Sequence, residues 1–185
     1  MTHRSSLARR RFLRHGAQLA TAVAAPMLVL PARATVPDGR ALAMWHTHTH
    51  ERIDLVYAVA KDYLPEALGS LNRFLRDHYS GEVGSMHPPL FDLLHQTRQL
   101  LGAAGPFEVI SGYRCPATND KLRHTRGRGV AQQSLHMQGR AIDVRLRGVP
   151  LAELRDAALS LRGGGVGYYP NEQFVHIDTG RVRSW

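Results

Sequence analysis

Hydrophobic and polar residues repeat along the chain with two different periods. Apolar residues recur at helical spacing in two long segments, and Gly102 fits the end of the second. The four predicted helices span 64–79, 89–102, 116–124 and 150–162. Period-two alternation with β-branched residues marks the strands instead. The five predicted strands span 40–49, 51–60, 107–114, 140–146 and 173–180.

This order of elements predicts an α+β fold with a small, mainly antiparallel sheet and helices packed against one of its faces. Internal repeats are absent, and no linker divides the sequence after residue 35, so residues 35–185 are expected to form a single domain. His46, His48 and His50 alternate along the first strand. We interpret them as a solvated strand face rather than as metal ligands.

The first 34 residues have the layout of a cleavable export signal. A basic start precedes an apolar stretch over 16–30, and Ala32-Arg33-Ala34 provides a small-x-small cleavage site. The run RRRFL over 9–13 resembles the twin-arginine pattern, with an ordinary secretory signal as the alternative. The apolar stretch is too short and too rich in alanine for a permanent span. The sequence therefore predicts a periplasmic protein with no membrane span after cleavage.

Removing this segment changes the charge of the protein. The whole chain carries a formal net charge of +9, from 24 basic and 15 acidic residues. Six arginines and no acidic residue lie in residues 1–34, so 18 basic and 15 acidic residues remain, a net charge of +3. This mild charge argues against nucleic acid as a partner. Cys115 is the sole cysteine, which excludes an internal disulfide.

Candidate chemistry begins with an aspartate inside an apolar strand, Asp143 in RAIDVRL. A buried carboxylate is costly unless a positive group meets it. Alternation places His176 and Asp178 on one face of the last strand, and His136 comes just before the Asp143 strand. If the two strands are neighbours, His136, Asp143 and His176 form the ligand set of a zinc site with an open position.

The spacing alone leaves a second interpretation open. His136 could lie on the surface, Asp143 could pair with Arg140 or Arg145 at a strand edge, and His176 could be a core histidine. Eleven histidines in the chain make a chance grouping of this kind common.

A longer match bears on this choice. Residues 134–143, with the pattern SxHxxGxAxD, resemble the zinc motif of the D-Ala-D-Ala metallopeptidases, which share a core with the hedgehog signalling domain. The stretches SGYRCPATNDKLR, RGRGVA, GGVGYYP and FVHIDTGRVRSW resemble the exported murein endopeptidase K branch of that superfamily. This resemblance covers about residues 40–185.

The resemblance implies a hedgehog-like fold, a Zn²⁺ cofactor and cleavage of peptide cross-links between peptidoglycan stem peptides during cell-wall growth. It implies His136, Asp143 and His176 as ligands, and Arg114 as the residue that holds a substrate carbonyl or carboxylate. Ser134 would orient a ligand or cap the turn. A D-Ala carboxypeptidase and a non-catalytic zinc-binding cell-wall module are the alternatives.

The general base is not identified by this resemblance. Gln173 and Phe174 stand where many relatives carry an acidic residue or a histidine, and neither accepts a proton from water at neutral pH. Asp178 is a candidate catalytic base or, equally, a group that orients an imidazole. Alternation predicts that Glu172 points away from the site. The oligomeric state and the bond that is cut stay open.

Overall fold

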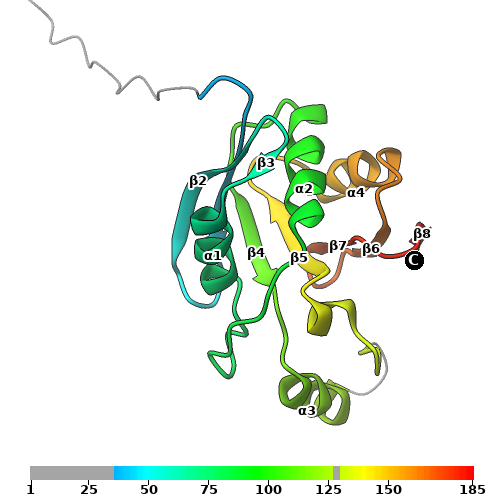
Figure 1. Ribbon diagram of the computed structural model, residues 1–185. Coiled ribbons are helices and arrows are strands. Elements are labelled where there is room, and N and C mark those ends of the chain that lie inside the picture. The colour runs from blue at the N-terminus through cyan, green and yellow to red at the C-terminus, as the bar shows by residue number, and fades with distance from the viewer. Residues whose placement is uncertain (1–35, 127–129) are drawn as a thin grey trace, which may run out of the picture. The chain divides into compact units, whose positions relative to one another are not determined.

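A mixed sheet of eight strands organises the computed structural model, which describes residues 36–126 and 130–185 (Figure 1). The strand order is β3-β2-β1-β4-β5-β7-β6-β8. The strands are β1 (Gly39–His46), β2 (Arg52–Val59), β3 (Asp62–Tyr63), β4 (Phe107–Ser111), β5 (Ala141–Leu146), β6 (Gly165–Tyr169), β7 (Phe174–Asp178) and β8 (Arg183–Ser184). The predicted α+β class is confirmed.

The sheet is larger and less uniform than the sequence predicted. The pairs β1–β4 and β6–β8 are parallel, whereas the other five pairs are antiparallel. A parallel pair needs a long crossover, and two helices lie between β1 and β4 in the chain. The strands β3 and β8 have only two residues each, too few to show a period in the sequence.

Three helices share one hydrophobic core with the sheet: α1 (Pro65–Phe74), α2 (Pro88–Leu100) and α4 (Leu151–Ser160). Leu71, Leu90 and Leu154 from these helices are fully buried with Ile142 and Ile177 from the sheet. The helix α3 (Pro116–Arg126) lies beyond the end of the strands (Figure 1). Helices therefore cover the sheet face that carries Ile142 and Ile177.

The other face of the central strands carries the polar residues. In β5, Asp143 alternates with the core residues Ile142 and Val144, and in β7, His176 alternates with Val175 and Ile177. The polar residues of β5 and β7 therefore share the face opposite the three helices.

Most predicted elements end earlier than expected, and the first helix and the first strand show why. The first helix ends at Phe74 rather than at residue 79, because the Asp77 side chain accepts the backbone N–H groups of Tyr79 at 2.9 Å and Cys115 at 3.0 Å. The strand β1 ends at His46, which is fully buried, while His48 lies in the following turn. The interpretation of the three histidines as a solvated strand face is wrong for His46.

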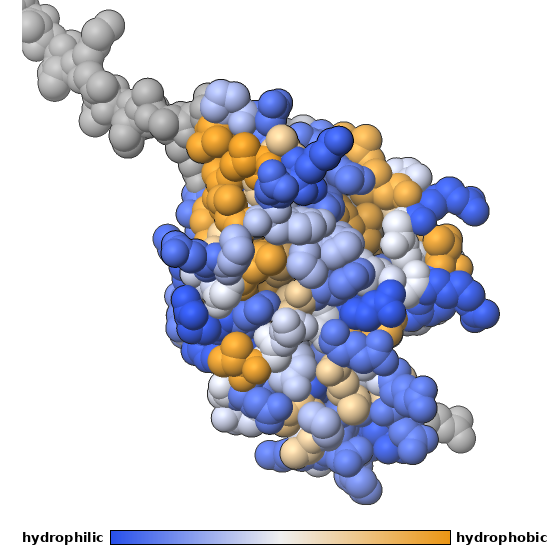
Figure 2. All heavy atoms as spheres, in the orientation of Figure 1, coloured by the Kyte–Doolittle hydropathy of each residue, from blue (hydrophilic) through white to orange (hydrophobic). Residues whose placement is uncertain are grey.

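The predicted export signal over 1–34 lies outside the described residues. Among the helices of the described part, none has the length and apolar character needed to cross a bilayer. On the face shown in Figure 2, hydrophobic residues occur in separate groups among hydrophilic ones.

Candidate metal centre

A short 3-10 helix, η1 (Leu135–Gln138), presents His136. The Ser134 hydroxyl oxygen caps this turn by accepting the backbone N–H of His136 at 3.4 Å. Gly139 ends the turn with a φ of 64°, and a Cβ at this position would overlap the carbonyl of Ser85. Only glycine fits here, so local backbone geometry fixes where the His136 side chain enters the site.

The protonation of His136 is set by one hydrogen bond. Its Nδ1 lies 2.7 Å from the Gly112 carbonyl oxygen, which can only accept, so Nδ1 carries the proton. Nε2 is then the ring nitrogen that faces Asp143, whose Oδ1 is 3.3 Å away. A neutral imidazole fixed by a carbonyl in this way is the form that ligates metal ions.

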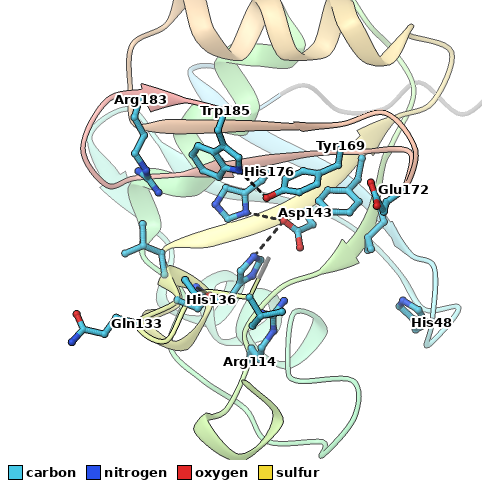
Figure 3. Close-up of a pocket in the computed structure, with 16 residues that line it drawn as sticks. His48, Arg114, Gln133, His136, Asp143, Tyr169, Glu172, His176, Arg183 and Trp185 are labelled. Carbon is cyan, nitrogen blue, oxygen red and sulfur yellow. Dashed lines mark hydrogen bonds and ion pairs between the residues drawn. The ribbon is translucent and has the colours of Figure 1, made fainter. Parts of the chain in front are cut away.

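Strand register brings the other two side chains together. Asp143 in β5 is paired directly with His176 in β7, and His176 Nδ1 lies 2.8 Å from Asp143 Oδ1. The rings of His136 and His176 are 5.1 Å apart between centroids. One ligand atom from each of His136, Asp143 and His176 lies within 4.8 Å of the others. The three side chains point toward one another in Figure 3. These three side chains could hold one metal ion.

The electrostatics of the three groups reflect a buried carboxylate held between two imidazoles. Burial alone would raise the pKa of Asp143, but the neighbouring His136 and His176 hold it well below its usual range. Burial alone would lower the pKa of His176, but hydrogen bonds to Asp143 and Asp178 raise it to about 9. The site thus stabilises a negative carboxylate at its centre and positive charge around it.

Asp178 lies behind His176 rather than in the open part of the site. It is fully buried, and its Oδ2 is 3.1 Å from His176 Nε2 and 2.8 Å from the Arg183 guanidinium. Its Oδ1 accepts the backbone N–H groups of Gly165 at 3.0 Å and Gly180 at 2.7 Å. With both oxygens engaged, Asp178 holds the Nε2 proton of His176, so Nδ1 is the nitrogen that faces Asp143 and that could ligate an ion in place of a proton.

A cleft of ≈ 690 Å³ opens over the three ligands. Ser134 and Arg114 line it, and the Arg114 guanidinium lies 3.4 Å from Asn119 Oδ1 and 3.5 Å from Ser111 Oγ. Glu172 also lines the cleft, so the expectation that it points away is wrong. Position 172 lies two residues before Phe174 and four before His176, so alternation itself places it on their face, and the expectation applied the alternation wrongly.

Sequence reasoning assigned no role to Arg183 and Trp185, which form one wall of this cleft with Tyr169. Tyr169, Arg183 and Trp185 line it, and Trp185 and Tyr169 lie above the ligands in Figure 3, with Arg114 below them. His48 is also part of the lining. The strand β8 carries Arg183 and is too short to be detected by periodicity. The resemblance of GGVGYYP, which includes Tyr169, and of FVHIDTGRVRSW, which includes Arg183 and Trp185, was the sequence signal for this wall.

This arrangement can bind a divalent cation through two imidazole nitrogens and one carboxylate. The cleft beside it leaves room for a solvent molecule and a substrate, which a closed structural site would not. Softer thiolate ligands are absent from the group. The donor set suits zinc and does not by itself exclude other first-row ions.

Comparisons with known proteins point to one family. Residues 34–185 match the family model described as peptidoglycan L,D-endopeptidase MepK. The Escherichia coli K12 protein of that name is 45% identical over 166 residues, covering 89% of this chain and 91% of that protein. A probable peptidoglycan L,D-endopeptidase MepK of Haemophilus influenzae is 41% identical over 155 residues, covering 83% of each chain.

Among solved structures, the L-Ala D-Glu endopeptidase ChiX of Serratia marcescens is similar over 42% of this chain and 62% of its own. The TM-score is 0.33 and the identity 24%, a likeness too low to support a functional argument.

Proposed function

The chain belongs to the MepK family of peptidoglycan L,D-endopeptidases, and from that premise we propose that it hydrolyses peptide cross-links between peptidoglycan stems with a bound zinc ion. The observation that carries the proposal is the convergence of His136, Asp143 and His176 at the base of a cleft. The fit to a cation is independent of the family: the Gly112 carbonyl leaves His136 Nε2 free to ligate.

A bound zinc ion would polarise the scissile carbonyl and lower the pKa of an attached water. The protein's part is to hold the three ligands in fixed orientations. The Gly112 carbonyl orients His136 through Nδ1, and Asp178 orients His176 through Nε2. We assign Asp178 this orienting role rather than that of the base, because its two oxygens are already engaged away from the cleft.

Arg114 is proposed to bind the substrate. A guanidinium beside the ligands can steady the oxyanion that develops on the cleaved carbonyl, or hold a stem carboxylate through two hydrogen bonds. Arg114 lines the cleft, and its backbone N–H donates to the His136 carbonyl at 3.2 Å. The residue is therefore tied directly to the turn that presents a ligand.

Two residues on the cleft lining could accept a proton from the attacking water. Apart from Asp143, Glu172 supplies the one carboxylate among the described lining residues, and His48 supplies an imidazole. Both side-chain types serve as general bases in hydrolases. Glu172→Gln and His48→Gln variants distinguish them, because loss of the base removes the acidic limb of the kcat profile against pH. If neither variant changes that limb, hydrolysis proceeds without a side-chain base.

Digestion of purified murein tests the proposed function. The wild-type protein should convert cross-linked muropeptide dimers to monomers, and chelation should abolish this conversion until zinc is restored. His136→Ala should be inactive, whereas His124→Ala, which alters an exposed histidine on α3, should match the wild type. Release of D-Ala without loss of dimers would indicate a carboxypeptidase. Zinc binding without any product would indicate a non-catalytic module.

Export through the twin-arginine route belongs to the same proposal, since peptidoglycan lies outside the cytoplasmic membrane. Replacing Arg9 and Arg10 with lysine should leave the precursor in the cytoplasm. Fractionation followed by immunoblotting measures this. Normal export of that variant would indicate the general secretory route instead.

A further inference from the structure

The last residues of the sequence are built into the wall of the cleft. The strand β8 runs parallel to β6, with Arg183 paired to Gly165 and Ser184 to Val166. Beyond it, the carbonyl oxygen of Trp185 accepts the N–H of Tyr168 at 2.9 Å, and the Trp185 N–H donates to the Val166 carbonyl at 3.3 Å. The backbone of Trp185 is thus held in place by the sheet.

Three contacts orient the indole ring of Trp185. Its Nε1 donates a hydrogen bond to the Tyr169 hydroxyl at 2.7 Å, and the Arg183 guanidinium lies 4.7 Å from the ring centroid. The ring centroid is 5.3 Å from that of His176. A hydrogen bond and a cation–π contact therefore place a large aromatic surface next to a proposed metal ligand.

Gly167 makes room for this ring. It is paired with His176 across β6 and β7, and a Cβ on Gly167 would lie 2.7–2.8 Å from three indole atoms of Trp185. Those distances are shorter than van der Waals contact, so any side chain here would push the indole away. The indole can reach its place over β6, beside His176, only because position 167 is glycine.

The indole is nevertheless half-exposed, with 49% of the residue accessible to solvent. Tyr169 stacks on Phe174 with ring centroids 4.6 Å apart, and both line the cleft with Trp185. We call Tyr169, Phe174 and Trp185 the aromatic wall. Fixing an exposed tryptophan so firmly beside a reaction centre adds little to the core, but it preorganises a surface that can bind a ligand.

We propose that Trp185 is a substrate-binding residue, whose indole packs against the backbone amides and aliphatic side chain of the stem-peptide residue next to the cleaved bond. This inference rests on the proposed function. The aromatic wall would bind one side of the peptide while Arg114, below the ligands in Figure 3, binds the polar groups on the other. Aromatic contact on one side and a charge on the other would fix the direction of the peptide.

Kinetics on a purified muropeptide dimer test this assignment. Trp185→Ala should raise KM about tenfold, which is the loss expected for a strong aromatic contact, and should change kcat less than about twofold. Gly167→Ala should do the same by displacing the ring. In the double variant the added methyl group has no indole to displace, so its KM should equal that of Trp185→Ala. Trp45→Phe, which changes a tryptophan outside the cleft lining, is the matched control.

Fluorescence gives a readout that does not need turnover. The chain has two tryptophans, so Trp45→Phe leaves Trp185 as the sole tryptophan, which excitation at the red edge of the absorption band selects over the tyrosines. Adding a muropeptide monomer, the expected product, to this zinc-loaded variant should change the Trp185 emission in a saturable manner. Unchanged emission together with an unchanged KM in Trp185→Ala would overturn the inference. A saturable change in a protein that cleaves no dimer would refute the proposed function and leave the binding site standing.

Discussion

Replacing Asp178 with asparagine separates an orienting role from a catalytic one. In the wild-type protein, the Asp178 carboxylate accepts from two backbone N–H groups through Oδ1 and from His176 and Arg183 through Oδ2. Asparagine has a single acceptor oxygen, which the two backbone N–H groups would retain. Its NH₂ group would then face His176 Nε2 and the Arg183 guanidinium, so that donors point at donors.

The least costly response is a change of tautomer in His176. Nε2 would lose its proton and accept from the asparagine, and the proton would move to Nδ1, the atom 2.8 Å from Asp143 Oδ1. A protonated Nδ1 cannot ligate a metal ion. Groups that orient a metal-bound imidazole are worth about 10–100-fold in metal affinity. That factor corresponds to about 1.4–2.7 kcal/mol of binding free energy.

We therefore expect Asp178→Asn to weaken zinc binding by about 10–100-fold and to recover most of its activity at saturating zinc. Competition with a chromogenic chelator measures the dissociation constant, and muropeptide digestion at high zinc measures kcat. Asp156→Asn, which changes an exposed aspartate on α4, is the control. Zinc affinity within twofold of the wild type, combined with a collapse of kcat, would refute the orienting role and make Asp178 the base.

Three further predictions concern stability. Chelation should lower the melting temperature of the wild type but not of His136→Ala, because only a protein that binds the ion is stabilised by it. Equal shifts in the melting temperatures of the two proteins would contradict the metal site. Gly139→Ala should cost at least about 2 kcal/mol in urea unfolding, from a positive φ and the overlap with Ser85; a smaller loss would mean that η1 readily rearranges. Burial, with His78 and His48 nearby, lowers the pKa of His46 to about 4 in the folded protein. Unfolding therefore takes up a proton as the pH falls below about 6.5, and the free energy of unfolding should fall by up to about 3 kcal/mol by pH 4. A His46→Leu variant should lose this part of the pH dependence, and an unchanged acid profile in that variant would refute the prediction.

Much of the site could be predicted because strand alternation is a local property. Asp143 and His176 each fall opposite core residues in their own strands, so their shared face follows from the sequence once the strands are paired. The pairing itself is not local, and the resemblance of residues 134–143 to a known motif supplied what spacing could not decide. His136 lies on a four-residue 3-10 turn that no periodicity reveals.

The errors have local causes as well. His46 was placed on a solvated face, but the strand ends there and its ring packs 5.9 Å from Phe74 inside the core. Glu172 was expected to point away from the site, but it is two residues from Phe174, so strand alternation places it on the same face as Phe174 and His176, which line the cleft with it. Trp185 went unnoticed because its position depends on a two-residue strand and on the absence of a side chain at Gly167.

The register of the central strands joins folding to chemistry. On the face opposite the helices, Ser111, Asp143, His176 and Gly167 lie side by side across β4, β5, β7 and β6. A shift of one residue in either pairing of β5 or β7 would turn a ligand into the apolar core and a core residue into the cleft. The hydrophobic face that selects the register also brings the ligands together. A metal ion bound by residues of both strands would in turn stabilise that register, so the site should form only with the native sheet.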